Sequence, residues 1–89
     1  MQPSAEDMAT MSRLLTHAEK QRILAIDAIQ HQPAKDALHK LAEFIEAVGY
    51  VKFARDSLPP LEARQYGRGL KVADKTVLSL CDEFEKRFL

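Results

Sequence analysis

The stretch YGRGLKVADKTVLSLCDEFEKRF (residues 66–88) carries the strongest structural signal in the chain. Its apolar positions recur at intervals of four, three, four, three, one, three and four residues, which is the spacing of one helix face. These positions are Tyr66, Leu70, Ala73, Val77, Leu80, Cys81, Phe84 and Phe88. The apolar periodicity continues without a shift across Gly67 and Gly69, although each glycine lowers helix stability by about 1 kcal/mol relative to alanine. The pattern predicts a long helix that opens at Pro60, with a restart near Lys71 as the alternative.

The N-terminal segment, from about Ser4 to Gln30, has the same periodicity. Ser4 is suited to the N-cap, and acidic residues 6 and 7 suit the first turn because the helix dipole favours anions there. The apolar side consists of Met8, Met11, Leu14, Leu15, Ala18, Ala25, Ile26 and Ile29. Thr16 and Glu19 form a second capping-box signature. The segment is therefore either one long helix or a short helix that restarts near Thr16.

The middle segment begins at Pro33, a residue well suited to the first helical position. One apolar stripe contains Ala37, Leu38, Leu41, Phe44, Ile45, Val48 and Val51. Because the stripe passes Gly49 in phase, it favours a helix that continues to about Asp56. The alternative is a helix end at Gly49 followed by a short extended piece, YVKFA, which would have no partner strand.

The segments together predict an all-α fold, a small bundle of three to four helices that forms a single domain over residues 1–89. No segment alternates between apolar and polar residues over a useful length. The chain is 46% hydrophobic and 29% charged, which is the composition of a folded protein.

Several features predict a cytoplasmic protein without a membrane partner. The single cysteine, Cys81, cannot form an internal disulfide and is compatible with a reducing compartment. The first ten residues lack a basic and then apolar signal pattern, and no apolar run approaches the roughly 20 residues that span a bilayer.

The chain shows no pattern typical of an enzyme, and we expect no catalytic residue, metal or cofactor. The histidines, His17, His31 and His39, lack the spacing of a zinc site and are expected to be exposed. Cys81 lies on the apolar side of its predicted helix, so we expect it to be buried and unreactive. The serines lack a nucleophile motif, and no glycine-rich loop could hold a phosphate.

One charged surface is a candidate binding site. Arg64, Arg68, Lys71 and Lys75 fall on one side of the predicted C-terminal helix, nearly opposite its apolar face. Residues 52–75 contain six Lys or Arg against three Asp or Glu, a local net charge of +3. A solvated helix side has the same appearance. As a binding site the row suits a protein partner better than nucleic acid, because the whole chain has a net charge of zero. Leu78 beside the row also favours a protein interface.

A second candidate surface lies on the N-terminal helix. Ile23 and Leu24 lie off its main apolar stripe, so they need another place to be buried. A second copy of the chain would provide one, and short chains often gain apolar burial by association. We therefore expect a small cytoplasmic regulator or adaptor that binds another protein, as an inhibitor or modulator, and forms a homodimer. The alternative is a nucleic-acid-binding transcriptional regulator that uses the basic row.

Overall fold

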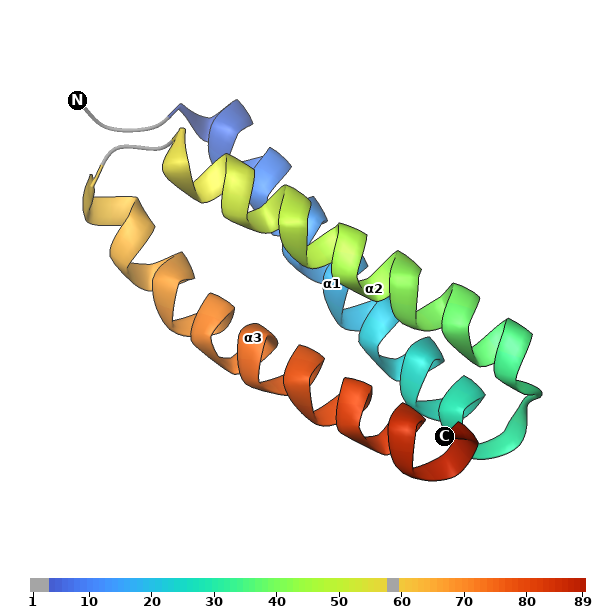
Figure 1. Ribbon diagram of the computed structural model, residues 1–89. Coiled ribbons are helices and arrows are strands. Elements are labelled where there is room, and N and C mark those ends of the chain that lie inside the picture. The colour runs from blue at the N-terminus through green and yellow to red at the C-terminus, as the bar shows by residue number, and fades with distance from the viewer. Residues whose placement is uncertain (1–3, 58–59) are drawn as a thin grey trace.

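The chain folds into three antiparallel α-helices, as the computed structural model shows over residues 4–57 and 60–89, with only the backbone described for residues 60–72. The helices are α1 (Ala5–His31), α2 (Ala34–Asp56) and α3 (Pro60–Phe88). Figure 1 shows the chain running down, up and down along one long axis, so that its two ends lie at opposite ends of the molecule. The all-α prediction is confirmed, with three helices in the described ranges.

The start of α1 confirms the N-cap predicted at Ser4. The Ser4 hydroxyl accepts a hydrogen bond from the Asp7 backbone N–H at 3.1 Å, and the Asp7 carboxylate accepts one from the Ser4 backbone N–H at 3.3 Å. This reciprocal pair satisfies two backbone donors that would otherwise lack partners. The helix then continues past Thr16 to His31 without a break. The apolar face stays in phase through Thr16, so burial of Met11 and Ala18 outweighs the local capping signal.

The other two helices also begin and continue close to the predicted positions. Pro33 is the N-cap of α2 rather than its first helical residue, a difference of one position. The helix passes Gly49 and ends at Asp56, which confirms the favoured continuation. Pro60 opens α3, and the backbone runs through Gly67 and Gly69 as one helix, so no restart at Lys71 is needed.

Alanine residues make up much of the core between α1 and α2. Ala25, Ala28 and Ala37 are fully buried, and Ala47 is nearly so. Small side chains let two helix axes approach closely, and α1 and α2 form the most extensive helix pair of the bundle. The large buried residues are Met11, Ile29, Leu41, Phe44, Val48, Val51 and Leu80.

Three residues assigned to the apolar stripes are exposed, which corrects the sequence prediction. Leu38 is 54% exposed, Met8 45% and Ile45 41%. The close α1–α2 contact turns α2 so that Ala47 faces the core, and this rotation moves Leu38 and Ile45 toward solvent. Leu41, Phe44, Val48 and Val51 of the predicted stripe stay buried, so the correction concerns only one edge of it.

The face predicted for α3 is confirmed over its described half. Leu80 is buried, and Ala73, Val77, Cys81, Phe84 and Phe88 pack against the core while partly exposed. Cys81 is thus only half-buried, not fully buried as expected. The side chains of Tyr66 and Leu70 lie outside the described part. The molecule measures 48 × 19 × 14 Å. Among the described residues, none of the helices combines the length and apolar character needed to cross a bilayer.

Candidate protein-docking surfaces

The basic row predicted on α3 is only partly described. The side chains of Arg64, Arg68 and Lys71 lie outside the described residues, while Lys75 and Leu78 are exposed, Leu78 at 68%. Two other positive charges counted in this region are paired. Lys52 Nζ lies 2.7 Å from Asp74 Oδ1, and Arg55 contacts Asp56 at 3.0 Å. These ion pairs reduce the positive charge available to a partner.

The two residues predicted to form a self-interface, Ile23 and Leu24, are exposed. Ile23 is 55% exposed and Leu24 38%. Consecutive helical residues point about 100° apart, so the two side chains do not share one narrow stripe. Neither of them belongs to the core of this chain.

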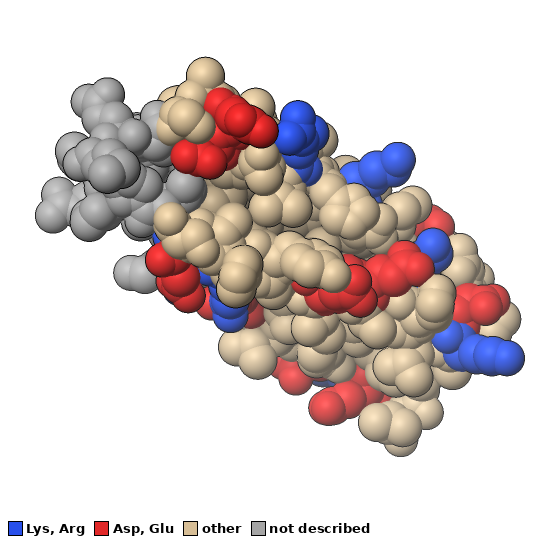
Figure 2. All heavy atoms as spheres, turned by 90° about the horizontal axis from the view of Figure 1, so that it is seen from above, with Lys and Arg blue, Asp and Glu red and all other residues tan. Residues whose placement is uncertain are grey.

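A groove between α1 and α2 is an open surface that the sequence prediction missed. In the space-filling view of Figure 2, which looks onto the side formed by these helices, uncharged side chains cover much of the surface between the charged groups. One hollow of it, of about 320 Å³, is lined by Asp7, Thr10, Met11, Leu14, Tyr50, Phe53, Ala54 and Ser57. A shallower hollow beside it is lined by Glu46, Gly49, Tyr50 and Phe53. A third is lined by His17, Gln21, Glu43, Glu46, Ala47 and Tyr50. Tyr50 lines all three, and together they are called the α1/α2 groove.

Two aromatic residues dominate the α1/α2 groove. Phe53 is 75% exposed and Tyr50 54%, and both lie in the last two turns of α2. An exposed phenylalanine contributes no burial energy to the fold. Exposed apolar side chains that cluster at a hollow are typical of an interaction surface. The sequence contained a signal for this surface, because the middle segment has more large apolar residues than a single stripe can bury.

The electrostatics of the α1/α2 groove are acidic. Asp7, Glu43 and Glu46 are among its lining residues, and none of those lining residues is Lys or Arg. Glu43 is partly neutralised by Lys40 at 3.5 Å, and His39 lies 2.9 Å from it. Glu46 is exposed and makes no hydrogen bond or ion pair with any residue of the described part. Glu46 is therefore available to an external positive charge.

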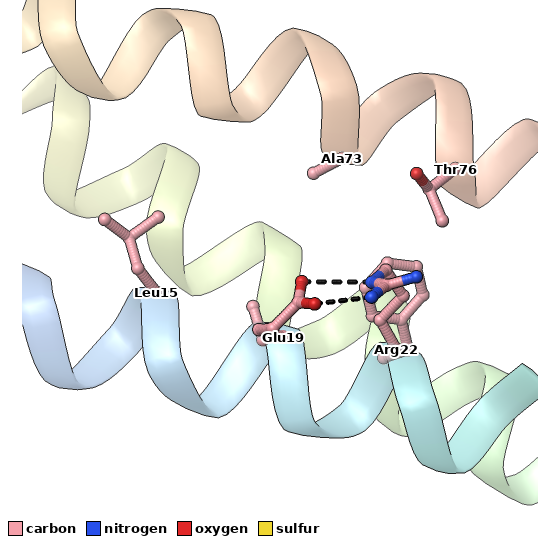
Figure 3. Close-up of a pocket in the computed structure, with 7 residues that line it drawn as sticks. Leu15, Glu19, Arg22, Ala73 and Thr76 are labelled. Atoms are coloured by element: carbon pink, nitrogen blue, oxygen red, sulfur yellow. Dashed lines mark hydrogen bonds and ion pairs between the residues drawn. The ribbon is translucent and has the colours of Figure 1, made fainter.

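A second hollow, the α1/α3 cleft, lies where α1 and α3 make few contacts. It has a volume of about 500 Å³ and is lined by Leu15, Ala18, Glu19, Arg22, Phe44, Ala73 and Thr76. In Figure 3 the Glu19 and Arg22 side chains on α1 point toward each other, with Ala73 and Thr76 across from them on α3.

The charges at the α1/α3 cleft neutralise each other. Arg22 donates two hydrogen bonds to the Glu19 carboxylate, one of them from Nε at 3.0 Å. These hydrogen bonds hold the pKa of Glu19 below its ordinary value and raise the pKa of Arg22, and slight burial opposes both shifts. Because Arg22 is already paired with Glu19, the cleft offers an apolar surface rather than an anion-binding site.

The residues that could bind a metal ion do not cluster in the described part of the chain. His17, His31 and His39 are exposed, as expected. Among the described residues, no group of three or more His, Cys, Asp or Glu is placed to hold a metal ion.

Comparison with known proteins gave no relative. No family model, no curated protein and no solved structure matched the chain.

Proposed function

We propose that this protein is a small cytoplasmic regulator or adaptor that acts by binding another protein, as an inhibitor or modulator. The observation that carries the proposal is the exposure of Phe53 and Tyr50 over the hollows between α1 and α2. Large aromatic side chains are the residues that most often dominate the binding energy of protein interfaces. An aromatic pair held on a rigid helix needs little reordering to receive a partner.

The basic row, with Arg64, Arg68, Lys71, Lys75 and Leu78, remains a second candidate surface for the same function. Lys75 and Leu78 support it by being exposed on α3. Such a row would accelerate association with an acidic partner and set its orientation.

Self-association through Ile23 and Leu24 is also part of the proposal. Their exposure leaves apolar area that a second chain could bury, at about 25 cal/mol per Å². Sedimentation equilibrium tests it by comparing the wild type with an Ile23→Glu, Leu24→Glu double variant. A dimer that dissociates in the double variant supports the self-interface. A wild-type monomer at about 100 µM, a Kd that corresponds to a binding free energy of about −5.5 kcal/mol, rejects it.

Capture of partners from the native host tests the protein-binding function and separates the two surfaces. Immobilised wild type is compared with Phe53→Ser and with a Lys75→Glu, Leu78→Ser double variant, and the retained proteins are identified by mass spectrometry. A specific protein that is lost only with Phe53→Ser assigns binding to the α1/α2 groove. Loss only with the double variant assigns it to the basic row.

The same material tests nucleic acid as the partner. If the retained molecule is RNA or DNA, and log affinity falls with log salt at a slope of roughly −3 to −4, the basic row is a phosphate-binding surface and the protein-binding proposal is wrong. Retention of neither a specific protein nor a nucleic acid would also contradict the proposal.

A further inference from the structure

We propose that the α1/α2 groove binds an amphipathic helix of a partner protein, with large apolar side chains against Tyr50 and Phe53 and a Lys or Arg beside Glu46. The inference rests on the proposed protein-binding function and specifies the chemistry of the partner. It is carried by the shape of the groove, by a glycine in its wall and by the sign of its charges.

The shape of the α1/α2 groove suits a helix. Its walls are two antiparallel helices, and side-chain ridges of a third helix pack into such a valley at axis distances of 8–10 Å. On α1 the lining residues run from Asp7 to Gln21. At 1.5 Å per residue this stretch is about 21 Å long, which matches a partner helix of about four turns. Such a helix presents anchors at positions i, i+3, i+4 and i+7 along one side.

Gly49 allows a partner backbone to come close. It lies in the interior of α2, where glycine costs about 1 kcal/mol relative to alanine. Among the described residues neither conformation nor packing requires it, because none has a positive φ and none of their atoms lies within 4 Å of a Cβ built there. The glycine instead leaves a flat place beside Tyr50 and Phe53, where a helix can approach more closely than over a side chain.

The charges of the groove determine which charge the partner helix carries and in which orientation it binds. At the Asp7 end the carboxylate is held in the α1 N-cap, and Arg13 hydrogen-bonds Thr10 there, so a partner cation gains little. At the other end Glu46 has no partner in the described part, and the buried Oε1 of Gln21 nearby lacks a donor. The partner's Lys or Arg therefore lies at the Glu46 end, and its largest apolar anchors lie at the Met11 and Phe53 end.

A designed peptide pair tests the proposal directly. The basic peptide is a 16-residue helix, about four and a half turns, with a Leu/Trp stripe and flanking lysines, and the acidic peptide has glutamates in place of the lysines. The protein contains no tryptophan, so the peptide's own fluorescence reports binding without background. We expect saturable one-to-one binding of the basic peptide and about tenfold weaker binding of the acidic one, a difference of about 1.4 kcal/mol.

Protein variants locate the peptide. Phe53→Ser is expected to lower the affinity for the basic peptide about tenfold or more, as expected for the loss of a residue that dominates an interface. Glu46→Lys should reverse the preference, so that the acidic peptide binds better than the basic one. Leu38→Ser, an exposed apolar residue of the same helix outside the groove, is the matched control and should leave both affinities unchanged.

Several results would overturn the inference. Absence of saturable binding of the basic peptide, equal binding of the two peptides by wild type, or no reversal with Glu46→Lys would each exclude it. If host capture still yields a specific protein in those cases, the protein-binding function stands and only the groove assignment fails. If Phe53→Ser instead abolishes self-association of the wild type, the occupant is a second copy and the partner chemistry proposed here is wrong.

Discussion

The guanidinium of Arg87, in the last turn of α3, donates a hydrogen bond to the backbone carbonyl oxygen of Ile29 in the last turn of α1. Carbonyl groups in the last turn of a helix lack partners within the helix, so the contact satisfies one of them. It also joins two helices that otherwise make few contacts. The same guanidinium lies 4.6 Å from the ring centre of Phe88, which is paired with Phe84 at the core edge.

Replacing Arg87 should therefore destabilise the bundle. Arg87→Met keeps much of the apolar stem but leaves the Ile29 carbonyl without its donor, and we expect the free energy of unfolding to fall by about 1 kcal/mol. Lys86→Met, in the same turn and exposed, is the control and should stay within about 0.5 kcal/mol. Urea denaturation followed by circular dichroism measures both. An equal loss in the control would show that charge, not this hydrogen bond, is responsible.

The Glu19–Arg22 pair predicts a pH-dependent contribution of known sign. Because the pKa of Glu19 is lowered in the folded state, its stabilising effect is present above the unfolded value and is lost as pH falls through the lowered pKa. The pair is largely exposed, so solvent screening keeps the effect small. Carboxyl NMR titration should show the Glu19 midpoint rising in Arg22→Ala. An unchanged midpoint would mean that the ion pair does not persist in solution.

Two neighbouring residues of α2 test how this helix is rotated about its axis. Phe44 is 1% exposed whereas Ile45 is 41% exposed. Phe44→Ala should cost about 3–5 kcal/mol, because it leaves a cavity in the core. Ile45→Ala removes a side chain already in contact with water and should cost less than about 1 kcal/mol. Thermal and urea unfolding compare the two variants, and similar losses would mean that α2 is rotated differently.

Gly49 predicts a conflict between stability and binding. Gly49→Ala should stabilise the fold by about 0.4–1 kcal/mol, because the added Cβ meets open space and the unfolded chain loses freedom. The same methyl group should lower the affinity for the basic peptide, because it keeps the peptide backbone farther from α2. Ala42→Gly, at another exposed position of α2, is the reciprocal control for helix propensity and should destabilise by a similar amount. A gain in stability without any change in peptide affinity would remove Gly49 from the docking surface.

The helix starts, to within one residue, and the extent of α2 could be predicted from the sequence because the signals for them are local, whereas the continuation of α1 past Thr16 was left open. Ser4 and Asp7 are three residues apart and cap α1 by themselves, and Pro60 can open a helix but cannot continue one. Continuation past Gly49 was also predictable, since the apolar pattern on its two sides has one phase. These features depend on contacts within a few residues, so they need no knowledge of the neighbouring helices.

The rotation of α2 was decided only by tertiary structure, and with it the candidate site. Periodicity assigns large apolar residues to the core, which placed Leu38 and Ile45 inside. Packing of two helices instead favours small residues where the axes come closest, and Ala47, which lay outside the predicted stripe, is buried together with Ala37, Ala25 and Ala28. Tyr50 and Phe53 lay outside the predicted stripe, and the structure shows them exposed beside an acidic groove. Sequence alone determined that α2 is a continuous helix with one apolar stripe, and the close contact of α1 with α2 decided which residues at the edge of that stripe face solvent.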